Sequence, residues 1–262
     1  MGLSAVLSAR DLSVSFGGVQ ALIDVALEVP EGSLVGLIGP NGAGKTTFID
    51  AITGFVRASG HVELDGRELS RMAPHERARS GLARTWQASE LFDDLTVGEN
   101  LAVATARPSR WATVRELLWK APPEGDAVRD ALGHVGMEAV VGKLPSELSQ
   151  GERKLVGVAR ALAAAPRVVC LDEPAAGLDS AESEQLGRQL RRLADGGTGV
   201  LLVDHDMGLV LGVCDHIVVL EFGKVIATGT PEEVRRDPRV VEAYLGGAGA
   251  RRAADALDIE AG

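Results

Sequence analysis

The chain has 262 residues, 45% of them hydrophobic and 24% charged, and its 37 acidic residues outnumber 27 basic ones to give a net charge of −10. This balance is typical of a soluble globular protein, and no apolar run approaches the ~18 residues needed to span a bilayer. The acidic charge argues against nucleic acid as a partner, and the two cysteines lie in apolar runs that predict buried thiols rather than a disulfide framework.

An antiparallel layer and the first unit of a parallel sheet are expected near the amino terminus. Residues 7–16 and 21–29 alternate between apolar and polar side chains and are separated by a glycine pair. Residues 33–39 then read as a short, fully apolar strand that leads through a glycine-rich turn into a helix over residues 45–55. A buried strand followed by a helix indicates an α/β fold with a parallel sheet.

Further elements continue the α/β pattern. Apolar strands are expected at residues 167–173, 198–205 and 216–222, with helical crossovers between them. The strand pattern disappears between residues 88 and 164, where we expect an inserted helical subdomain. The predicted division is a nucleotide-binding core of residues 1–87 and 165–245, a helical subdomain of residues 88–164 and a flexible tail of residues 246–262.

A phosphate-binding loop follows the first apolar strand. Residues 39–46 read GPNGAGKT and match G-x-x-x-x-G-K-[ST] at the start of a helix. In such a loop backbone N–H groups surround the β-phosphate, Lys45 neutralises the β and γ oxygens, and the Thr46 hydroxyl faces Mg²⁺. The sequence therefore predicts a P-loop NTPase core of the RecA-like kind. The nucleotide-binding residues expected here are Gly39, Pro40, Asn41, Gly42, Ala43, Gly44, Lys45, Thr46 and Thr47.

Two adjacent carboxylates end the strand expected at residues 167–173. Asp172 follows four apolar residues, where it can reach the water shell of a metal held at the phosphate loop. Glu173 points elsewhere, because side chains alternate along a strand, and it can orient or deprotonate the attacking water. A solvated strand end is the alternative interpretation, and the presence of the phosphate loop favours the functional one.

A second helix start with anion-binding character lies far downstream of the phosphate loop. Residues 148–152 read LSQGE and open the helical stretch ELSQGERKLVGVARAL. The first N–H groups of a helix lack internal partners, and the helix dipole favours negative charge there. The chain is therefore predicted to have two helix N-termini suited to binding a phosphate group.

The order of these motifs resembles that of the ATP-binding subunits of ABC transporters. The phosphate loop is followed by LSQGE, CLDEP, GLD and VDH, and the resemblance covers nearly the whole chain. It implies an enzyme that binds ATP and Mg²⁺, hydrolyses ATP, and works as a dimer of ATPase subunits beneath transmembrane permeases. The chain would then be cytoplasmic and peripheral on the inner face of the cell membrane.

The resemblance implies roles for four further residues. Gln87 matches the lid glutamine that contacts Mg²⁺ and the attacking water, and Asp179 matches the residue that communicates across the dimer. His205 matches the switch histidine at the γ-phosphate, and Phe16 takes the position of the aromatic side chain that stacks on adenine. Outside this set of motifs, Gln87 and His205 would be ordinary polar residues and Phe16 an ordinary packing residue of a strand.

The resemblance also explains the second helix start. In the family the serine and the second glycine of this turn, here Ser149 and Gly151, contact the γ-phosphate held by the opposite subunit. The family's commonest spelling is Leu-Ser-Gly-Gly-Gln, whereas this chain has Gln150 and Glu152. An acid close to a triphosphate requires that Glu152 point away or pair with a basic residue of the same turn.

Short phrases of the sequence look most like the branched-chain amino-acid importer branch. They are RTWQASELFDDLTVGENLAVA, DHDMGLVLGVCDHIVVLEFGKVIATGTPEEV and DPRVVEAYLG. The likeness implies import of branched-chain or other hydrophobic amino acids, with a second ATPase, two permeases and indirectly a solute-binding protein as partners. Two other classes stay open: a soluble ABC ATPase that drives assembly of another complex, and an exporter ATPase of the lipopolysaccharide-transport type.

Overall fold

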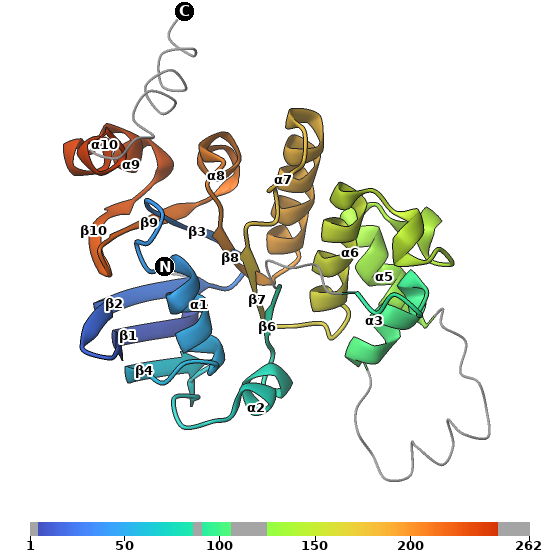
Figure 1. The fold of residues 1–262 in the computed structure, drawn as a ribbon, viewed down its shortest axis with the longest axis horizontal. Coiled ribbons are helices and arrows are strands. Elements are labelled where there is room, and N and C mark those ends of the chain that lie inside the picture. Colours follow the sequence, from blue (N-terminus) through green and yellow to red (C-terminus); the bar gives the residue numbers. More distant parts are fainter. Residues whose placement is uncertain (1–4, 86–90, 106–124, 246–262) are drawn as a thin grey trace, which may run out of the picture.

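The structure is a computed structural model that describes residues 5–85, 91–105 and 125–245. A six-stranded sheet with the order β10-β9-β3-β8-β7-β6 forms its centre, with β10 antiparallel to β9 and the other neighbours parallel (Figure 1). Its strands are β3 (Leu34–Ile38), β6 (Leu82–Arg84), β7 (Val168–Asp172), β8 (Gly199–Val203), β9 (His216–Glu221) and β10 (Lys224–Gly229). The parallel α/β sheet confirms the prediction, although β6 and β10 were not expected, and β6 is too short to show a pattern.

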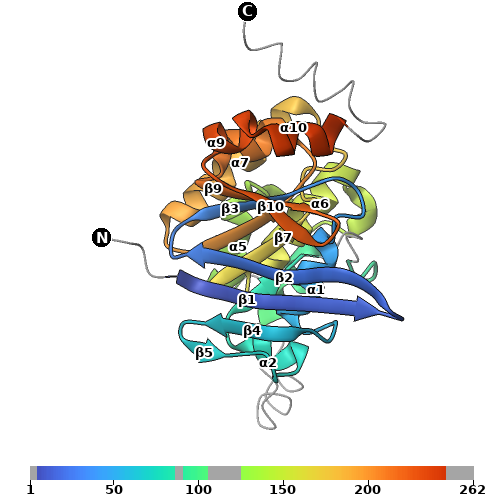
Figure 2. The ribbon, with the colours of Figure 1, turned by 90° about the vertical axis from the view of Figure 1, so that its left-hand side faces the viewer.

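A second, four-stranded sheet has the order β2-β1-β4-β5, with antiparallel neighbours (Figure 2). Its strands are β1 (Ala5–Phe16), β2 (Val19–Pro30), β4 (Ser59–Leu64) and β5 (Arg67–Glu68). The β1–β2 hairpin is the predicted antiparallel layer. Its turn is made by two glycines, Gly17 and Gly18, with φ angles of 52° and 90°. Neither β4 nor β5 was predicted from the sequence.

Apolar side chains form two clusters, one on each face of the central sheet. Along β7, Val169 and Leu171 belong to one cluster, whereas Val168 and Cys170 belong to the other, because side chains alternate along a strand. The second cluster includes α1 and the antiparallel sheet, so α1 is packed between the two sheets. Both cysteines are free and buried, as predicted.

Helices flank the central sheet and are the main elements of the described part of the segment predicted to be an insertion. They are α1 (Lys45–Thr53), α2 (Pro74–Arg79), α3 (Val97–Thr105), α5 (Asp126–Val135), α6 (Gln150–Leu162), α7 (Ser180–Asp195), α8 (Met207–Val213), α9 (Pro231–Arg236) and α10 (Pro238–Leu245). The described parts of the predicted insertion contain α3, α5, α6 and two short 3-10 turns. None of the helices in the described ranges is long and apolar enough to cross a membrane.

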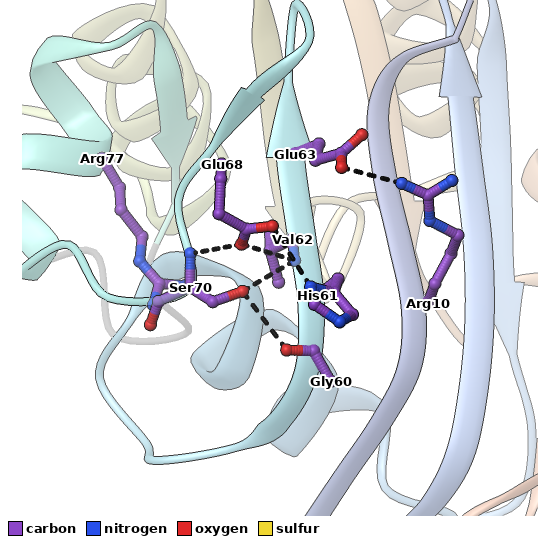
Figure 3. A network of polar contacts seen from close by, with 8 residues as sticks. All are labelled: Arg10, Gly60, His61, Val62, Glu63, Glu68, Ser70 and Arg77. Atoms are coloured by element: carbon purple, nitrogen blue, oxygen red, sulfur yellow. Dashed lines mark hydrogen bonds and ion pairs between the residues drawn. The ribbon is translucent and has the colours of Figure 1, made fainter.

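The carboxyl end of α1 is held by Arg77 of α2. Arg77 is 5% exposed and donates hydrogen bonds to the carbonyls of Ala51 and Ile52, at 2.9 and 2.7 Å, and to the carbonyl of Ser70 at 2.9 Å. Ser70 belongs to a polar network on the antiparallel sheet (Figure 3), where its hydrogen bonds lower the pKa of Glu68 to about 2. These contacts fasten the end of α1 to the edge of that sheet.

Candidate functional site

The phosphate loop joins β3 to α1 and packs closely against β9 and β2. A Cβ on Gly39 would overlap the Leu220 carbonyl of β9, and one on Gly44 would lie 2.8 Å from the Ala21 carbonyl of β2. Glycine is therefore required at both positions. Gly44 also starts α1 without a side-chain cap, and the first turn contains no acidic residue. The uncapped N–H groups of this turn form an anion-binding site.

Lys45 points back across the phosphate loop. The side chain is nearly buried, and its Nζ donates to the carbonyl of Gly39 at 2.7 Å and to that of Pro40 at 3.2 Å. Burial lowers the pKa of Lys45, while the negative charges of Glu173 and Asp172 oppose this shift. The ammonium group is thus held inside the loop, where an incoming phosphate would meet it.

The end of β7 carries a buried carboxylate, that of Asp172. Asp172 is 3% exposed, and neither of its side-chain oxygens has a hydrogen-bond partner among the described residues. Burial raises the pKa of Asp172 to about 6, helped by Glu173 and opposed by Arg84 and by the Thr46 hydroxyl. A buried carboxylate of this kind is suited to bind a cation, and Mg²⁺ takes one or two carboxylates completed by phosphate and water oxygens. The residues at this strand end therefore fit the predicted Mg²⁺ ion.

Glu173 has a strained backbone. Its φ of 51° lies in the left-handed region, which is unfavourable for residues other than glycine. Its N–H donates to the Val203 carbonyl of β8 at 2.7 Å, and its own carbonyl accepts from Lys154 Nζ at 3.3 Å. Because Glu173 and Asp172 both act on the pKa of Lys45, the two carboxylates and the loop lysine share one electrostatic environment.

Asp204 is a buried residue of the site that sequence reasoning missed. It is 1% exposed and accepts the backbone N–H groups of Ala175 at 3.0 Å, His205 at 2.8 Å and Asp206 at 3.0 Å. It thereby joins the loop after β7 to the loop after β8 and holds His205, whose side chain is 63% exposed. An Asp directly after a buried strand is a typical turn former, and this was the available signal.

The two buried aspartates should respond oppositely to amidation. Asp172 has a raised pKa, so its ionisation favours the unfolded chain at neutral pH, and this penalty disappears as the pH falls below about 4. We expect Asp172→Asn to raise the free energy of unfolding at pH 7.5 by on the order of 1–3 kcal/mol, with a smaller gain at pH 5. Asp204→Asn weakens three hydrogen bonds and should lower the free energy of unfolding by about 1–3 kcal/mol.

Urea unfolding without nucleotide or Mg²⁺ measures both effects. The pair is matched, because both side chains are buried aspartates at the ends of neighbouring strands. A loss of stability for Asp172→Asn at pH 7.5 would show that the carboxylate already has a compensating partner in the ligand-free protein.

The turn at Ser149 starts α6 with a reciprocal pair of hydrogen bonds. The Glu152 N–H donates to Ser149 Oγ at 3.2 Å, and the Ser149 N–H donates to the Glu152 carboxylate at 2.7 Å. Hydrogen bonds from Ser149, chiefly from its backbone N–H, lower the pKa of Glu152, so Ser149 itself holds this carboxylate. Gly151 is buried against Leu178, and a Cβ there would lie 2.9 Å from that side chain.

The remaining predicted residues occupy different surroundings. Asp179 is the N-cap of α7 and accepts the Glu182 N–H at 2.8 Å. Phe16 is the last residue of β1 and is 50% exposed, so it does not belong to the core. Gln87 lies outside the described residues. The structure therefore places the phosphate loop, Asp172 and the Asp204–His205 turn at the carboxyl ends of neighbouring parallel strands.

The helix that follows the phosphate loop, α1, and the helix that begins at Ser149, α6, lie on opposite faces of the central sheet. Phe48 and Ile52 of α1 belong to the cluster shared with the antiparallel sheet, whereas Val156 and Leu162 of α6 belong to the other cluster. In Figure 1, α1 and α6 accordingly lie on either side of β7. This arrangement favours binding of two different phosphate groups by the N-termini of α1 and α6.

An apolar groove of about 680 Å³ opens between α2, β6, α3 and α6. Three large apolar side chains in it are about half-exposed, namely Phe55 at 52%, Phe92 at 53% and Val103 at 50%. The groove also reaches Asp172 and Glu173. Exposed apolar side chains gathered in one groove are typical of a surface that another protein covers.

Similar known proteins are ATP-binding components of transporters. Residues 22–176 match the family model described as ABC transporter, and residues 224–250 match that described as branched-chain amino acid ATP-binding cassette transporter. The high-affinity branched-chain amino acid transport ATP-binding protein BraF of Pseudomonas aeruginosa is 38% identical over 92% of this chain and 98% of its own. The lipopolysaccharide export system ATP-binding protein LptB of Acidithiobacillus ferridurans is 38% identical over 93% of this chain and 98% of its own. A solved nucleotide-free ATP-binding cassette from an ABC transporter matches with a TM-score of 0.81 and 30% identity, covering 93% of this chain and 100% of that one.

Proposed function

This chain belongs to the ABC transporter family of ATP-binding subunits, and we propose that it powers the import of branched-chain or other hydrophobic amino acids. Its family hydrolyses ATP, so the chain is an ATP hydrolase. The observation that carries the substrate class is the match of residues 224–250 to the branched-chain amino-acid cassette model. Identity alone does not favour import, because relatives named for amino-acid transport and for lipopolysaccharide export are equally similar.

In the proposed site the nucleotide lies along the phosphate loop from Phe16 to Asp172. The half-exposed ring of Phe16 is available to stack on adenine, which supports a binding role over strand packing. The backbone N–H groups of residues 41–47 surround the phosphates, and Lys45 neutralises the β and γ oxygens. Thr46 and Asp172, with Gln87, would hold Mg²⁺, which when bound supplies charge neutralisation at the phosphates.

Hydrolysis is assigned to residues at the ends of β7 and β8. Glu173 accepts a proton from the attacking water, and Gln87 orients that water. His205 contacts the γ-phosphate from a turn that Asp204 holds by backbone hydrogen bonds. The left-handed conformation of Glu173 supports this assignment, because strained backbone is concentrated at functional sites.

A second ATPase subunit completes each site in this proposal. Ser149 and Gly151 start α6 on the opposite face of the sheet from α1, so they are placed to serve a nucleotide bound by the facing subunit. The Ser149 oxygen accepts the Glu152 N–H, and a γ-phosphate that approaches the turn would compete with the Glu152 carboxylate for the Ser149 hydroxyl proton. Asp179, the N-cap of α7, communicates between the two nucleotide sites of the dimer.

The apolar groove is the proposed docking site for a permease. It lies between the nucleotide-binding core and the helical subdomain of residues 88–164, and its exposed apolar side chains match an apolar partner segment. Docking there would hold the chain at the inner face of the cell membrane. A solute-binding protein would act on the chain only indirectly, through the permeases.

Purification from the native membrane tests the proposed function. A tagged chain is expected to carry two permeases and a second, different ATPase, and proteoliposomes of this complex should take up labelled leucine when ATP is supplied. The Lys45→Ala complex is the control and should assemble without uptake. Recovery of this ATPase alone with permeases would contradict the two-ATPase arrangement. Lipopolysaccharide release in place of uptake would favour an exporter, and the absence of any membrane partner would favour the assembly ATPase.

A further inference from the structure

Arg84 of β6 is a charged residue that lines the apolar groove. Its side chain is only 7% exposed. One guanidinium nitrogen lies 2.5 Å from Asp50 Oδ1 and 3.3 Å from Thr53 Oγ1. The guanidinium carbon lies 5.4 Å from the centre of the Phe55 ring. A planar guanidinium can satisfy a carboxylate at its edge and an aromatic ring at its face at the same time.

Two of these contacts hold the far end of the phosphate-loop helix. Asp50 and Thr53 lie towards the carboxyl end of α1, whose last turn contains no basic residue of its own. Arg84 adds a second positive charge at this end of α1, beside that of Arg77. Because a nine-residue helix moves as a rigid unit, a shift at its carboxyl end also moves Lys45 at its start.

The segment that carries Arg84 is also hydrogen-bonded to the backbone of β7, the strand that ends in Asp172. The next residue, Thr85, donates its N–H to the Cys170 carbonyl at 2.9 Å and accepts the Asp172 N–H at its hydroxyl at 3.0 Å. The positive charge of Arg84 also opposes the rise of the Asp172 pKa that burial causes. Arg84 therefore lies between α1 and the end of β7.

The aromatic partner of Arg84 faces the apolar groove. Phe55 is 52% exposed, and both residues line the groove together with Asp172 and Glu173. A segment that fills the groove would cover Phe55 and exclude water from its contact with the Arg84 guanidinium. Excluding water strengthens the attraction between a cation and an aromatic ring, which holds the guanidinium more firmly in place.

We propose that Arg84 is a positioning residue that links occupation of the apolar groove to ATP hydrolysis. This inference rests on the proposed function, because the occupant is taken to be a permease segment. The guanidinium fixes the end of α1 against β6 and β7, and a permease segment on Phe55 tightens that fixation. The phosphate loop and Asp172 are thereby held in their working positions when the groove is filled.

The first arm of the test uses the isolated full-length chain. Arg84→Ala should lower kcat by about 10- to 100-fold, because small misplacements of reacting groups have effects of this size. The dissociation constant of a fluorescent ATP analogue without Mg²⁺ should change by less than about threefold. Arg84→Lys keeps a charge for Asp50 and should retain kcat within about threefold, which separates positioning from a general loss of structure.

A double-mutant cycle identifies the link to α1. Asp50→Ala should lower kcat about as much as Arg84→Ala, and Arg84→Ala/Asp50→Ala should be no worse than either single variant, since both remove the same link. Thermal unfolding of each variant shows whether it is folded at the assay temperature. Additive losses in the double variant, or a wild-type kcat in Arg84→Ala, would overturn the positioning role.

The second arm uses the reconstituted complex with permeases. Phe55→Ala should leave kcat of the isolated chain within about twofold but abolish most of the stimulation that permeases cause. Arg84→Lys should lose stimulation in the same way, because its ammonium lacks a planar face for the ring. Phe222→Ala is the matched control, since Phe222 is also an exposed phenylalanine, at 81%, but lies outside the groove.

The two arms distinguish the inference from the proposed function. Normal stimulation of Phe55→Ala would overturn the link between the groove and Arg84. If no permease stimulates the wild-type chain, the proposed function fails, and the isolated-chain arm still decides whether Arg84 positions α1.

Discussion

Glu173→Gln should lower the rate of ATP hydrolysis by about 10² to 10⁴-fold and leave ATP binding intact. Glutamine has the size of glutamate but cannot accept the proton of the attacking water. The charge of Glu173 acts on both Lys45 and Asp172, which places the carboxylate beside the phosphate site. Phosphate release measures turnover, and equilibrium binding of ATP measures affinity in the same preparation.

Glu221→Gln is a suitable control for this experiment. Glu221 ends β9 at the same edge of the sheet, so it tests the loss of a nearby negative charge without loss of a proposed catalytic group. Its turnover should stay within about threefold of the wild type. Unchanged turnover in Glu173→Gln would remove that residue from the role of general base. Loss of ATP binding along with turnover would instead indicate that the strained turn at Glu173 has a structural role.

Mixing two inactive variants should restore hydrolysis if each site is shared between two chains. Lys45→Ala disables the phosphate loop, and Ser149→Arg blocks the start of α6, so either change alone removes every complete site from a dimer. A mixed dimer contains one site with both defects and one site with neither. We therefore expect turnover to return in part on mixing, whereas a chain that completes its own site would show no recovery.

A third variant controls for nonspecific recovery in the mixture. Lys45→Ala mixed with the double variant Lys45→Ala/Ser149→Arg contains no intact phosphate loop and should stay inactive. A dimer that needs two intact sites would also stay silent, so ATP-dependent dimerisation must be measured alongside turnover. Absence of recovery, combined with monomeric behaviour at saturating ATP, would mean that Ser149 starts an ordinary helix.

Contiguous motifs carry the prediction of the phosphate site. The loop at residues 39–46 and the Asp172–Glu173 pair each depend on neighbouring residues, and strands β3 and β7 are buried on both faces, so both are apolar apart from Asp172 at the end of β7. The start of α6 at Ser149 was predictable for the same reason, because its N-cap and first turn are local. The roles of Gln87, His205 and Asp179 came from family resemblance and remain predictions.

Residues whose function depends on distant segments were missed. The Asp204 carboxylate accepts a hydrogen bond from Ala175 across two loops, and Arg84 meets Asp50 and Phe55 only after α1 has packed beside β6. Glu152 was expected to point away from the phosphates or to pair with a basic residue, and the structure holds its carboxylate at the Ser149 N–H, because a capping box forms within one helical turn.

The sequence by itself determined the α/β class, the phosphate loop and the helix start at Ser149, since alternation, glycines and caps act over a few residues. Only the tertiary structure decided that α1 and α6 lie on opposite faces of one sheet, that the Asp172 side chain is buried, and that Phe55, Arg84 and Asp50 form one chain of contacts. Burial and side-chain pairing across many residues depend on how elements pack, and a linear pattern carries no information about which surfaces will meet.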